Sequence, residues 1–435
     1  MVTRAIGSWG GLERRPHEWI ALANRREVTA TISRSALPGL VFGNGRSYGD
    51  ECLNAGGTLW GARGLDRFID FDADSGEVTC EAGVLLSEII DLVLPSGWFL
   101  PVVPGTSFVT VGGAVANDVH GKNHHAAGTF GEHVLSLQLT RTDGRRIRCA
   151  PDENPDYLAA TIGGLGLTGV IESARLRLRR VPGEWIDVES ESFESLDEFL
   201  ALSEKAKDAW EYSVAWIDCG PGGRGEARGV LFCGNHAAAD QRAAKRPDRR
   251  VPFDLPFSLV SEPSVRAFNA LYRRLHRGRK AGSQHHRPFF FPLDSVQDWN
   301  RIYGRGGFYQ YQCVVPEEAQ QAATRALLKT VSAQGSASFL AVLKTFGPRR
   351  SAGLLSFPMA GTTLALDFPN RRADTLRLFQ ELDAIVSSAG GRLYPAKDAR
   401  MPESLFKSSY PRWQEFVAYR DPGMSSQMSR RLFGS

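Results

Sequence analysis

The sequence predicts an α+β protein built from two domains. Its 435 residues are enough for two or three domains of about 100 to 200 residues each. Residues 36–180 are rich in glycine, and their short apolar runs between turn signals indicate many short strands with a few helices. After Pro182 and Gly183, longer helical patterns alternate with strand-like runs, which is typical of a mixed α and β domain.

Several elements have clear patterns. Residues 83–95 show the apolar spacing of a helix that ends at Pro95 and Gly97. Alternation from Ala174 onward predicts a strand with one solvated face. Helices are expected over 196–209 and 317–334, strands over 308–315 and 363–368, and loops at the glycine cluster 220–225 and in the basic stretch after Ala239.

The composition is that of an ordinary globular protein, with 42% hydrophobic and 23% charged residues. Six cysteines stand singly without a C-x-x-C pair, which argues against a disulfide framework or a zinc site and indicates a reducing compartment.

The N-terminus lacks the apolar core of a signal peptide, and no run approaches the ~18 apolar residues of a membrane span. We therefore expect a cytoplasmic protein. A formal net charge of only +4 argues against a nucleic-acid partner.

One local stretch is more basic than the rest. Between Arg266 and Arg287 it contains Arg273, Arg274, His276, Arg277, Arg279, Lys280, His285 and His286. Such a run is usually a solvated loop or an exposed helix face, and this is the first interpretation. The alternative is a surface that meets anionic lipid or a phosphate-bearing substrate.

Residues 164–169 match the G-x-G-x-x-G pattern of dinucleotide-binding proteins. That fingerprint requires a strand before the glycines and a helix after them. Here a helix-like segment, 155–162, precedes the glycines and an alternating strand follows. The order is reversed, so the helix dipole would not point at a pyrophosphate and a Rossmann domain is not expected.

Two other glycine-rich loops point to a cofactor. Residues 43–50 read Gly-Asn-Gly-Arg-Ser-Tyr-Gly-Asp, and glycines at alternate positions let backbone N–H groups converge on an anion. Alone, this loop would be interpreted as a turn between two strands. Residues 104–125 carry small side chains at Gly112, Gly113, Ala114 and Ala116, which would let a bulky planar ligand lie against the backbone. Together in one domain, the loops predict a large phosphate-containing cofactor.

These segments resemble FAD-linked oxidoreductases of the vanillyl-alcohol oxidase type, and among them the decaprenylphosphoryl-β-D-ribose 2′-oxidases. The turn at 163–169 and the Leu-Tyr-Pro-Ala-Lys-Asp segment at 393–398 also carry the resemblance, which runs from about Trp9 to Leu432. It implies a two-domain fold of that type, with an FAD-binding domain over 1–182 and a mixed α+β substrate domain with an antiparallel sheet over 183–392. A C-terminal segment over 393–435 would return to the FAD-binding domain.

The resemblance implies an FAD site wrapped by Val41 to Glu51 and lined by further glycine-rich backbone. Its members would be Val41, Gly43, Asn44, Gly45, Arg46, Ser47, Tyr48, Gly49, Gly105, Thr110, Val111, Gly112, Gly113, Asn117, His120, Ile171 and Tyr394. In relatives with a covalent flavin, a histidine stands where this sequence has Arg46. Arginine cannot form that bond, so we expect FAD to be bound non-covalently.

The catalytic residues implied by the resemblance are Lys397, His120 and Lys122, because Lys397 matches the family's active-site lysine and the other two match residues beside the flavin. Substrate contacts would come from Gln310, Gln312, Phe290, Ala365 and Lys397. The family enzyme has a cysteine at Ala365 and a tyrosine at Phe290, so hydrogen-bonding groups are lost here and substrate hydroxyls would be discriminated differently. No metal is expected, because Gly121 breaks the helix that i, i+4 histidine ligands would need.

The implied reaction is FAD-dependent oxidation of a sugar secondary hydroxyl to a ketone. The substrate would be the 2′-OH of a polyprenylphosphoryl ribose or a related sugar, as the oxidative half of an epimerisation. A separate short-chain reductase would be the partner, and the basic stretch would suit peripheral contact with the inner membrane face. Two alternatives stay open: a soluble sugar, alditol or aldonolactone oxidase that produces hydrogen peroxide, and a scaffold that keeps the flavin fold without turnover.

Overall fold

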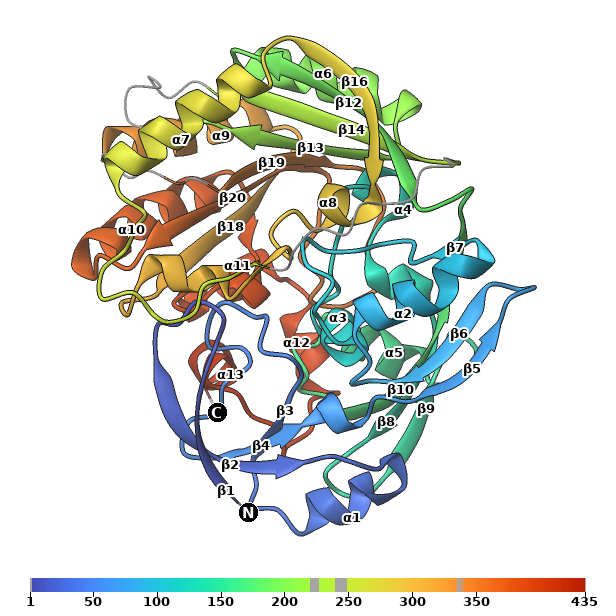
Figure 1. Cartoon of the computed structure of the whole chain (residues 1–435). Coiled ribbons are helices and arrows are strands. Elements are labelled where there is room, and N and C mark those ends of the chain that lie inside the picture. The colour runs from blue at the N-terminus through green and yellow to red at the C-terminus, as the bar shows by residue number, and fades with distance from the viewer. Residues whose placement is uncertain (1, 220–226, 239–248, 335–337, 339, 435) are drawn as a thin grey trace.

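The computed structural model describes residues 2–219, 227–238, 249–334, 338 and 340–434. The loop predicted at 220–225 and residues 239–248, the start of the loop predicted after Ala239, lie outside the described residues. The chain forms two lobes, with the N-terminal strands and the last helices in the lower one and a large sheet with its helices in the upper one (Figure 1). The predicted α+β class is confirmed. Among the described residues, no helix is long and apolar enough to cross a membrane.

Two sheets build the lower lobe. The first has the order β1-β2-β4-β3, with β2 and β3 both parallel to β4, and comprises β1 (Val2–Gly7), β2 (Arg14–Ala21), β3 (Gly39–Phe42) and β4 (Thr58–Gly61). The second is antiparallel in the order β5-β6-β10-β8-β9, with β5 (Phe68–Asp72), β6 (Glu77–Glu81), β8 (Val134–Thr140), β9 (Arg146–Cys149) and β10 (Val170–Arg177). A small ladder joins β7 (Trp98–Phe99) to β11 (Arg179–Arg180).

Short helices connect these strands: α1 (Val28–Ser33), α2 (Leu86–Val93), α3 (Val111–Ala116), α4 (His124–Ala127) and α5 (Pro155–Thr161). Helix α2 is followed by a 3-10 turn that ends at Gly97, whose φ of 78° is the left-handed conformation that glycine adopts without strain. This confirms the predicted helix and its stop signal. Helix α5 precedes the 164–169 glycines and β10 follows them, so the reversed order predicted for that segment is also confirmed.

The upper lobe is built on an eight-stranded sheet whose neighbouring strands are all antiparallel. Its order is β16-β12-β14-β13-β19-β20-β18-β21. The strands are β12 (Trp185–Phe193), β13 (Tyr212–Ile217), β14 (Gly229–Ala237), β16 (Arg279–His285), β18 (Phe308–Pro316), β19 (Ala341–Phe346), β20 (Gly361–Pro369) and β21 (Arg392–Leu393). Elsewhere, β15 (Arg249–Arg250) pairs with β17 (Val296–Gln297).

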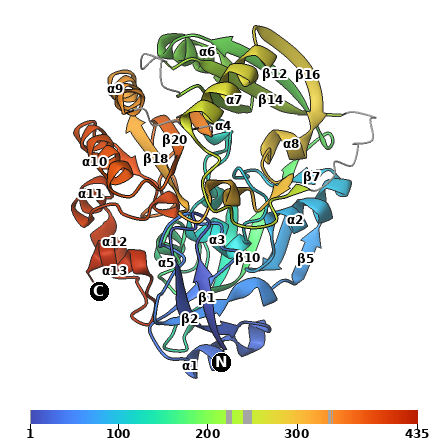
Figure 2. The same cartoon turned by 60° about the vertical axis from the view of Figure 1, so that its left-hand side comes forward.

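Among the described elements, three helices cover one face of this sheet, and the opposite, open face is covered only in part. The covering helices are α6 (Leu196–Ala209), α9 (Gln320–Ala333) and α10 (Ala373–Ser388), and the last two lie outside β18 and β20 (Figure 2). Strand β18 shows the division, because Tyr311 and Cys313 join the core while Gln310 and Gln312 point to the opposite face. The remaining helices of this lobe are α7 (Glu262–Leu275) and α8 (His286–Phe290).

The segment after β21 packs against the lower lobe. It contains α11 (Glu403–Ser409), α12 (Trp413–Val417) and α13 (Gln427–Phe433). Gly39 in β3 exchanges backbone hydrogen bonds with Gly423 and Ser425. Arg141 donates to the carbonyl of Tyr419 at 2.8 Å. These contacts support the proposed return of residues 393–435 to the first domain.

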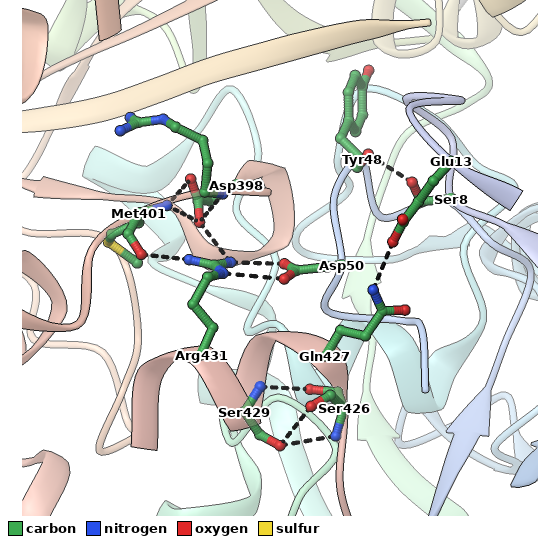
Figure 3. A network of polar contacts seen from close by, with 11 residues as sticks. Ser8, Glu13, Tyr48, Asp50, Asp398, Met401, Ser426, Gln427, Ser429 and Arg431 are labelled. Carbon is green, nitrogen blue, oxygen red and sulfur yellow. Dashed lines mark hydrogen bonds and ion pairs between the residues drawn. The ribbon is translucent and has the colours of Figure 1, made fainter. Parts of the chain in front are cut away.

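Arg431 in α13 joins three segments that are distant in sequence (Figure 3). Its guanidinium donates to both carboxylate oxygens of Asp50, at 3.1 Å from Nε and 2.7 Å from Nη2, and Nη2 also lies 3.0 Å from Asp398 Oδ2. Its Nη1 donates to the carbonyl of Met401. Burial raises the pKa of Asp50, and Arg431 opposes that shift. One cation therefore satisfies two carboxylates that have little access to water.

We expect Arg431→Met to destabilise the protein by about 3 kcal/mol, because it leaves Asp50 and Asp398 without their counter-charge. The matched control is Arg412→Met, whose ion pair with Glu415 is half exposed and should contribute less than about 1 kcal/mol. Thermal unfolding of both variants at constant flavin content measures the difference. Equal melting temperatures would contradict the role given to Arg431.

Candidate active site

A cavity of about 710 Å³ lies where the N-terminal loops meet the open face of the large sheet. This volume falls in the range of about 300 to 1,000 Å³ that is usual for ligand pockets. The lining includes Lys397, His120, Lys122, Val41, Gly43, Asn44, Gly45, Arg46, Ser47, Tyr48, Gly105, Thr110, Gly112, Gly113, Asn117, Ile171, Tyr394, Gln310, Gln312 and Ala365. The fold thus brings most of the predicted site residues around one space.

Three predicted site residues lie outside this lining. Gly49 is held where a Cβ would come within 1.7 Å of the Asp398 carbonyl, so it serves the close approach of two loops. Val111 is buried in the core at the start of α3. The Phe290 ring turns away from the cavity to stack on Phe99 at 5.4 Å, and Phe289 lines the cavity in its place.

The first glycine loop and the start of α3 approach each other closely. A Cβ on Gly43 would lie 2.6 Å from the Thr110 hydroxyl oxygen, which itself accepts a hydrogen bond from the Gly113 N–H at 3.2 Å. Asn44 donates to the carbonyl of Phe108 at 2.7 Å. Glycine at position 43 is therefore required for the contact that fixes the loop against the helix.

The same region has the polar groups and open space that FAD requires. The cavity lies open beside Gly105 and Gly166, where an added Cβ would meet no atom within 4 Å. Asn117 Oδ1 and Arg46 Nε are buried and, within the described chain, have no hydrogen-bond partner. The Arg46 guanidinium also lies 4.1 Å from the Trp9 ring centroid. A ligand with both donors and acceptors, together with a planar ring system, matches these groups.

Three lysines give the cavity a cationic side. Each retains some exposed surface, but that surface faces the cavity, so the protein still desolvates the charge. Burial lowers the pKa of Lys397 to about 7 and that of Lys344 to about 8. Burial, with the nearby charge of Lys344, lowers the pKa of Lys122 to about 7. Near neutral pH these amines exchange protons readily, which suits acid–base chemistry.

Lys397 sits among groups from several elements. Its Nζ lies 3.8 Å from the centroid of the Tyr48 ring, and the backbone N–H of Tyr48 donates to Ala396 at 3.0 Å. Burial raises the pKa of Asp367 to about 7, against the opposing effects of a 2.6 Å hydrogen bond from Gln310 and of the Lys397 charge. Gln310 and Asp367 are directly paired across β18 and β20. Gln310 and Asp367 therefore form a hydrogen-bonded polar pair near Lys397.

A second polar group connects His120 with the sheet. The amide nitrogen of Gln312 lies 3.1 Å from His120 Nε2 and 3.4 Å from the Thr363 hydroxyl. Burial, together with the charge of Lys344, lowers the pKa of His120 well below its usual value, so the imidazole is neutral. A neutral ring accepts the amide hydrogen through Nε2, which leaves the proton on Nδ1. His120 Nδ1 is a buried atom without a partner in the described structure.

Two functional residues were missed in the sequence. Lys344 lines the cavity and donates to the carbonyl of Gly121 at 3.2 Å, and Asp367 supports Gln310. Both had a detectable signal, because a charged residue within an apolar strand is rarely buried unless it is paired or functional. Trp9 and Asp294, which also line the cavity, had no such signal.

The comparisons with known proteins agree with this geometry. Residues 20–150 match the family model described as an FAD binding domain. The chain is 34% identical to the decaprenylphosphoryl-β-D-ribose oxidase of Mycolicibacterium smegmatis, over 99% of this chain and 97% of that protein. The chain belongs to this family of FAD-linked oxidoreductases. It is therefore an FAD-dependent oxidoreductase of the vanillyl-alcohol oxidase type that acts on CH–OH groups.

Other relatives match parts of the chain. L-gulonolactone oxidase of Mus musculus is 28% identical over 42% of this chain and 42% of its own length. The human Δ(24)-sterol reductase is 29% identical over 26% of this chain. An uncharacterised protein of Streptomyces coelicolor is 35% identical over 80% of this chain and all of its own length.

We expect FAD to leave the protein when it is denatured by acid. Arg46 lines the cavity at the position implied for the covalent histidine of some relatives, and its guanidinium lies 4.1 Å from the Trp9 ring centroid and 5.5 Å from the Phe108 ring centroid. Absorption spectra of the supernatant and of the washed precipitate after acid treatment give the measurement. Yellow colour retained in the precipitate would show a covalent bond and contradict the prediction.

Proposed function

We propose that the protein oxidises the 2′-hydroxyl of a polyprenylphosphoryl ribose, or of a closely related lipid-linked sugar, to a ketone. The observation that carries the proposal is the cluster of Lys122, Lys344 and Lys397 in one cavity with Gln310 and Gln312. Cations suit a phosphate-bearing substrate, and amides suit sugar hydroxyls. The name of the Mycolicibacterium relative supports the same substrate class.

In this proposal Lys397 is the base that accepts the hydroxyl proton. Its lowered pKa leaves much of the amine neutral near pH 7, and Asp367 stabilises the charged form once the proton has been taken. Gln310, held by Asp367, orients a sugar hydroxyl. Bound FAD would supply the acceptor for the hydride that leaves the carbinol carbon. Lys122 supplies positive charge beside the reacting groups, while neutral His120 holds Gln312.

We further propose that residues 1–182 and 393–435 hold the cofactor and residues 183–392 the sugar. The glycine loops come from the first part, and Gln310, Gln312 and Ala365 come from the second. A short-chain reductase would then consume the ketone as the other half of an epimerisation. Peripheral membrane contact through the basic stretch is supported by Arg274 and Arg277, which are exposed and have no acidic partner among the described residues.

Anaerobic mixing with farnesylphosphoryl ribose is expected to bleach the bound flavin within seconds. Free ribose, alditols and aldonolactones should bleach it at least about 100-fold more slowly, because they lack the phosphate and the lipid chain. Stopped-flow absorbance of the flavin is the measurement. Rapid bleaching by free sugars with hydrogen peroxide release in air would instead support a soluble oxidase. No bleaching by any sugar would leave only the scaffold alternative.

The rate of flavin reduction is expected to rise with pH and to level off above about pH 7. Below its pKa of about 7, Lys397 already carries a proton and cannot accept another. Lys344→Met removes a positive charge that lowers the pKa of Lys397, so the midpoint of the rate–pH profile should move to higher pH. Asp367→Asn removes a negative charge that raises it, so the midpoint should move to lower pH.

Lys397→Arg provides the control for this profile. Arginine stays protonated at all accessible pH values, so we expect a loss of at least about 100-fold in rate and no remaining inflection near pH 7. Shifts of the same sign in the Lys344 and Asp367 variants, or an unchanged profile in Lys397→Arg, would reject Lys397 as the base.

A further inference from the structure

Exposed apolar side chains are concentrated in α7 and in the segment that precedes it. Of thirteen large hydrophobic residues that are exposed in the described structure, six lie in one stretch of the chain. They are Phe253, Phe257, Leu259, Phe268, Leu271 and Leu275, with exposed fractions between 41% and 66%. Only Val265 and Asn269 of α7 are fully buried. Exposed apolar groups scattered singly are normal, so their concentration in this part of the chain calls for an explanation.

The inner side of α7 forms part of the cavity wall. Phe268, Tyr272 and His276 follow one another at intervals of four residues, which places them on one side of the helix. All three line the cavity, together with Trp216 of β13 and Phe232 of β14. Tyr272 contacts Trp216 with ring centroids 4.6 Å apart, and His276 contacts Phe232 at 5.4 Å. The cavity thus extends from the lysines to an aromatic wall under α7.

The strand register connects the part of the cavity near the lysines with the aromatic wall under α7. On the open face of the sheet, Gln312 of β18 is paired with Ala365 of β20, Ala365 with Val342 of β19, and Val342 with Trp216 of β13. All four line the cavity. Strands lie about 4.8 Å apart, so this row spans about 14 Å across the sheet. It changes from an amide at one end to aliphatic and aromatic side chains at the other, next to α7.

We propose that this row and the aromatic side of α7 form the subsite for the isoprenoid chain of the substrate. The inference deepens the proposed function, because it gives a place to the lipid part of a lipid-linked sugar. With the sugar beside Lys397 and Gln310, the chain follows Ala365, Val342 and Trp216 and leaves the protein along α7. The small side chain of Ala365 leaves room where this path begins. Continuity with the cationic cavity is the reason for choosing an isoprenoid phosphate as the occupant.

The test compares ligands that share a phosphate and differ only in chain length. We expect the holoprotein to bind farnesyl phosphate at least about tenfold more tightly than dimethylallyl phosphate, because the added chain is removed from water. Calorimetric titration below the aggregation concentration of the lipid measures both affinities. Phe268→Gln should reduce this affinity ratio about threefold, since it removes an aromatic wall.

Leu92→Gln is the matched control, because Leu92 is 38% exposed against 41% for Phe268 and does not line the cavity. It should leave the affinity ratio unchanged. Equal affinities for the two phosphates, or a ratio that Phe268→Gln does not alter, would overturn the inference. Failure of flavin bleaching by the ribose-linked lipid would reject the sugar assignment alone, since chain binding is measured without turnover.

Discussion

The contact between the loop at 43–51 and the loop at 395–401 is the constraint on which the site depends. Gly49 lets the two backbones meet where any side chain would overlap the Asp398 carbonyl. Arg431 then holds Asp50 and Asp398 together from a third segment. This contact fixes Lys397 relative to the loop at 43–51. The Tyr48 N–H donates to the carbonyl of Ala396, and Lys397 is the next residue. A shift in either loop would change the position of Lys397 in the cavity wall.

Burial of the three lysines lowers their pKa values and so determines the acid–base properties of the cavity. The lysines are surrounded by protein, and Asp367, the carboxyl whose charge acts on Lys397, is itself difficult to ionise because it is buried. An amine in such a place is a base near neutral pH, whereas the same amine on the surface would stay protonated. Asp367 limits the effect, because its negative charge keeps the pKa of Lys397 from falling further. Burial and the Asp367 charge therefore act on the pKa of Lys397 with opposite signs.

The sequence was sufficient for local features and for motifs. Helix α6 begins and ends at the predicted residues, because Ser195 caps it and its apolar spacing is regular. Strand β16 was not predicted, since Arg-Lys-Ala-Gly-Ser-Gln-His has no apolar alternation; it forms by pairing its backbone with β12 at the sheet edge. The link between Gln310 and Asp367 depends on the register of two strands distant in sequence, and no local pattern encodes that register.

The basic stretch shows how one helix can present different kinds of side chain on different faces. Helix α7 is an exposed helix face, as a solvated charge run would be, and Arg273 is paired with Glu194 at the surface. Its Phe268 and Tyr272 nevertheless belong to the cavity wall. Charge alone could not distinguish these faces, because the arginines and the aromatic residues alternate within the same turns. The helical period places the aromatic residues on one face of α7. The register of the sheet connects that face with the part of the cavity that contains the lysines.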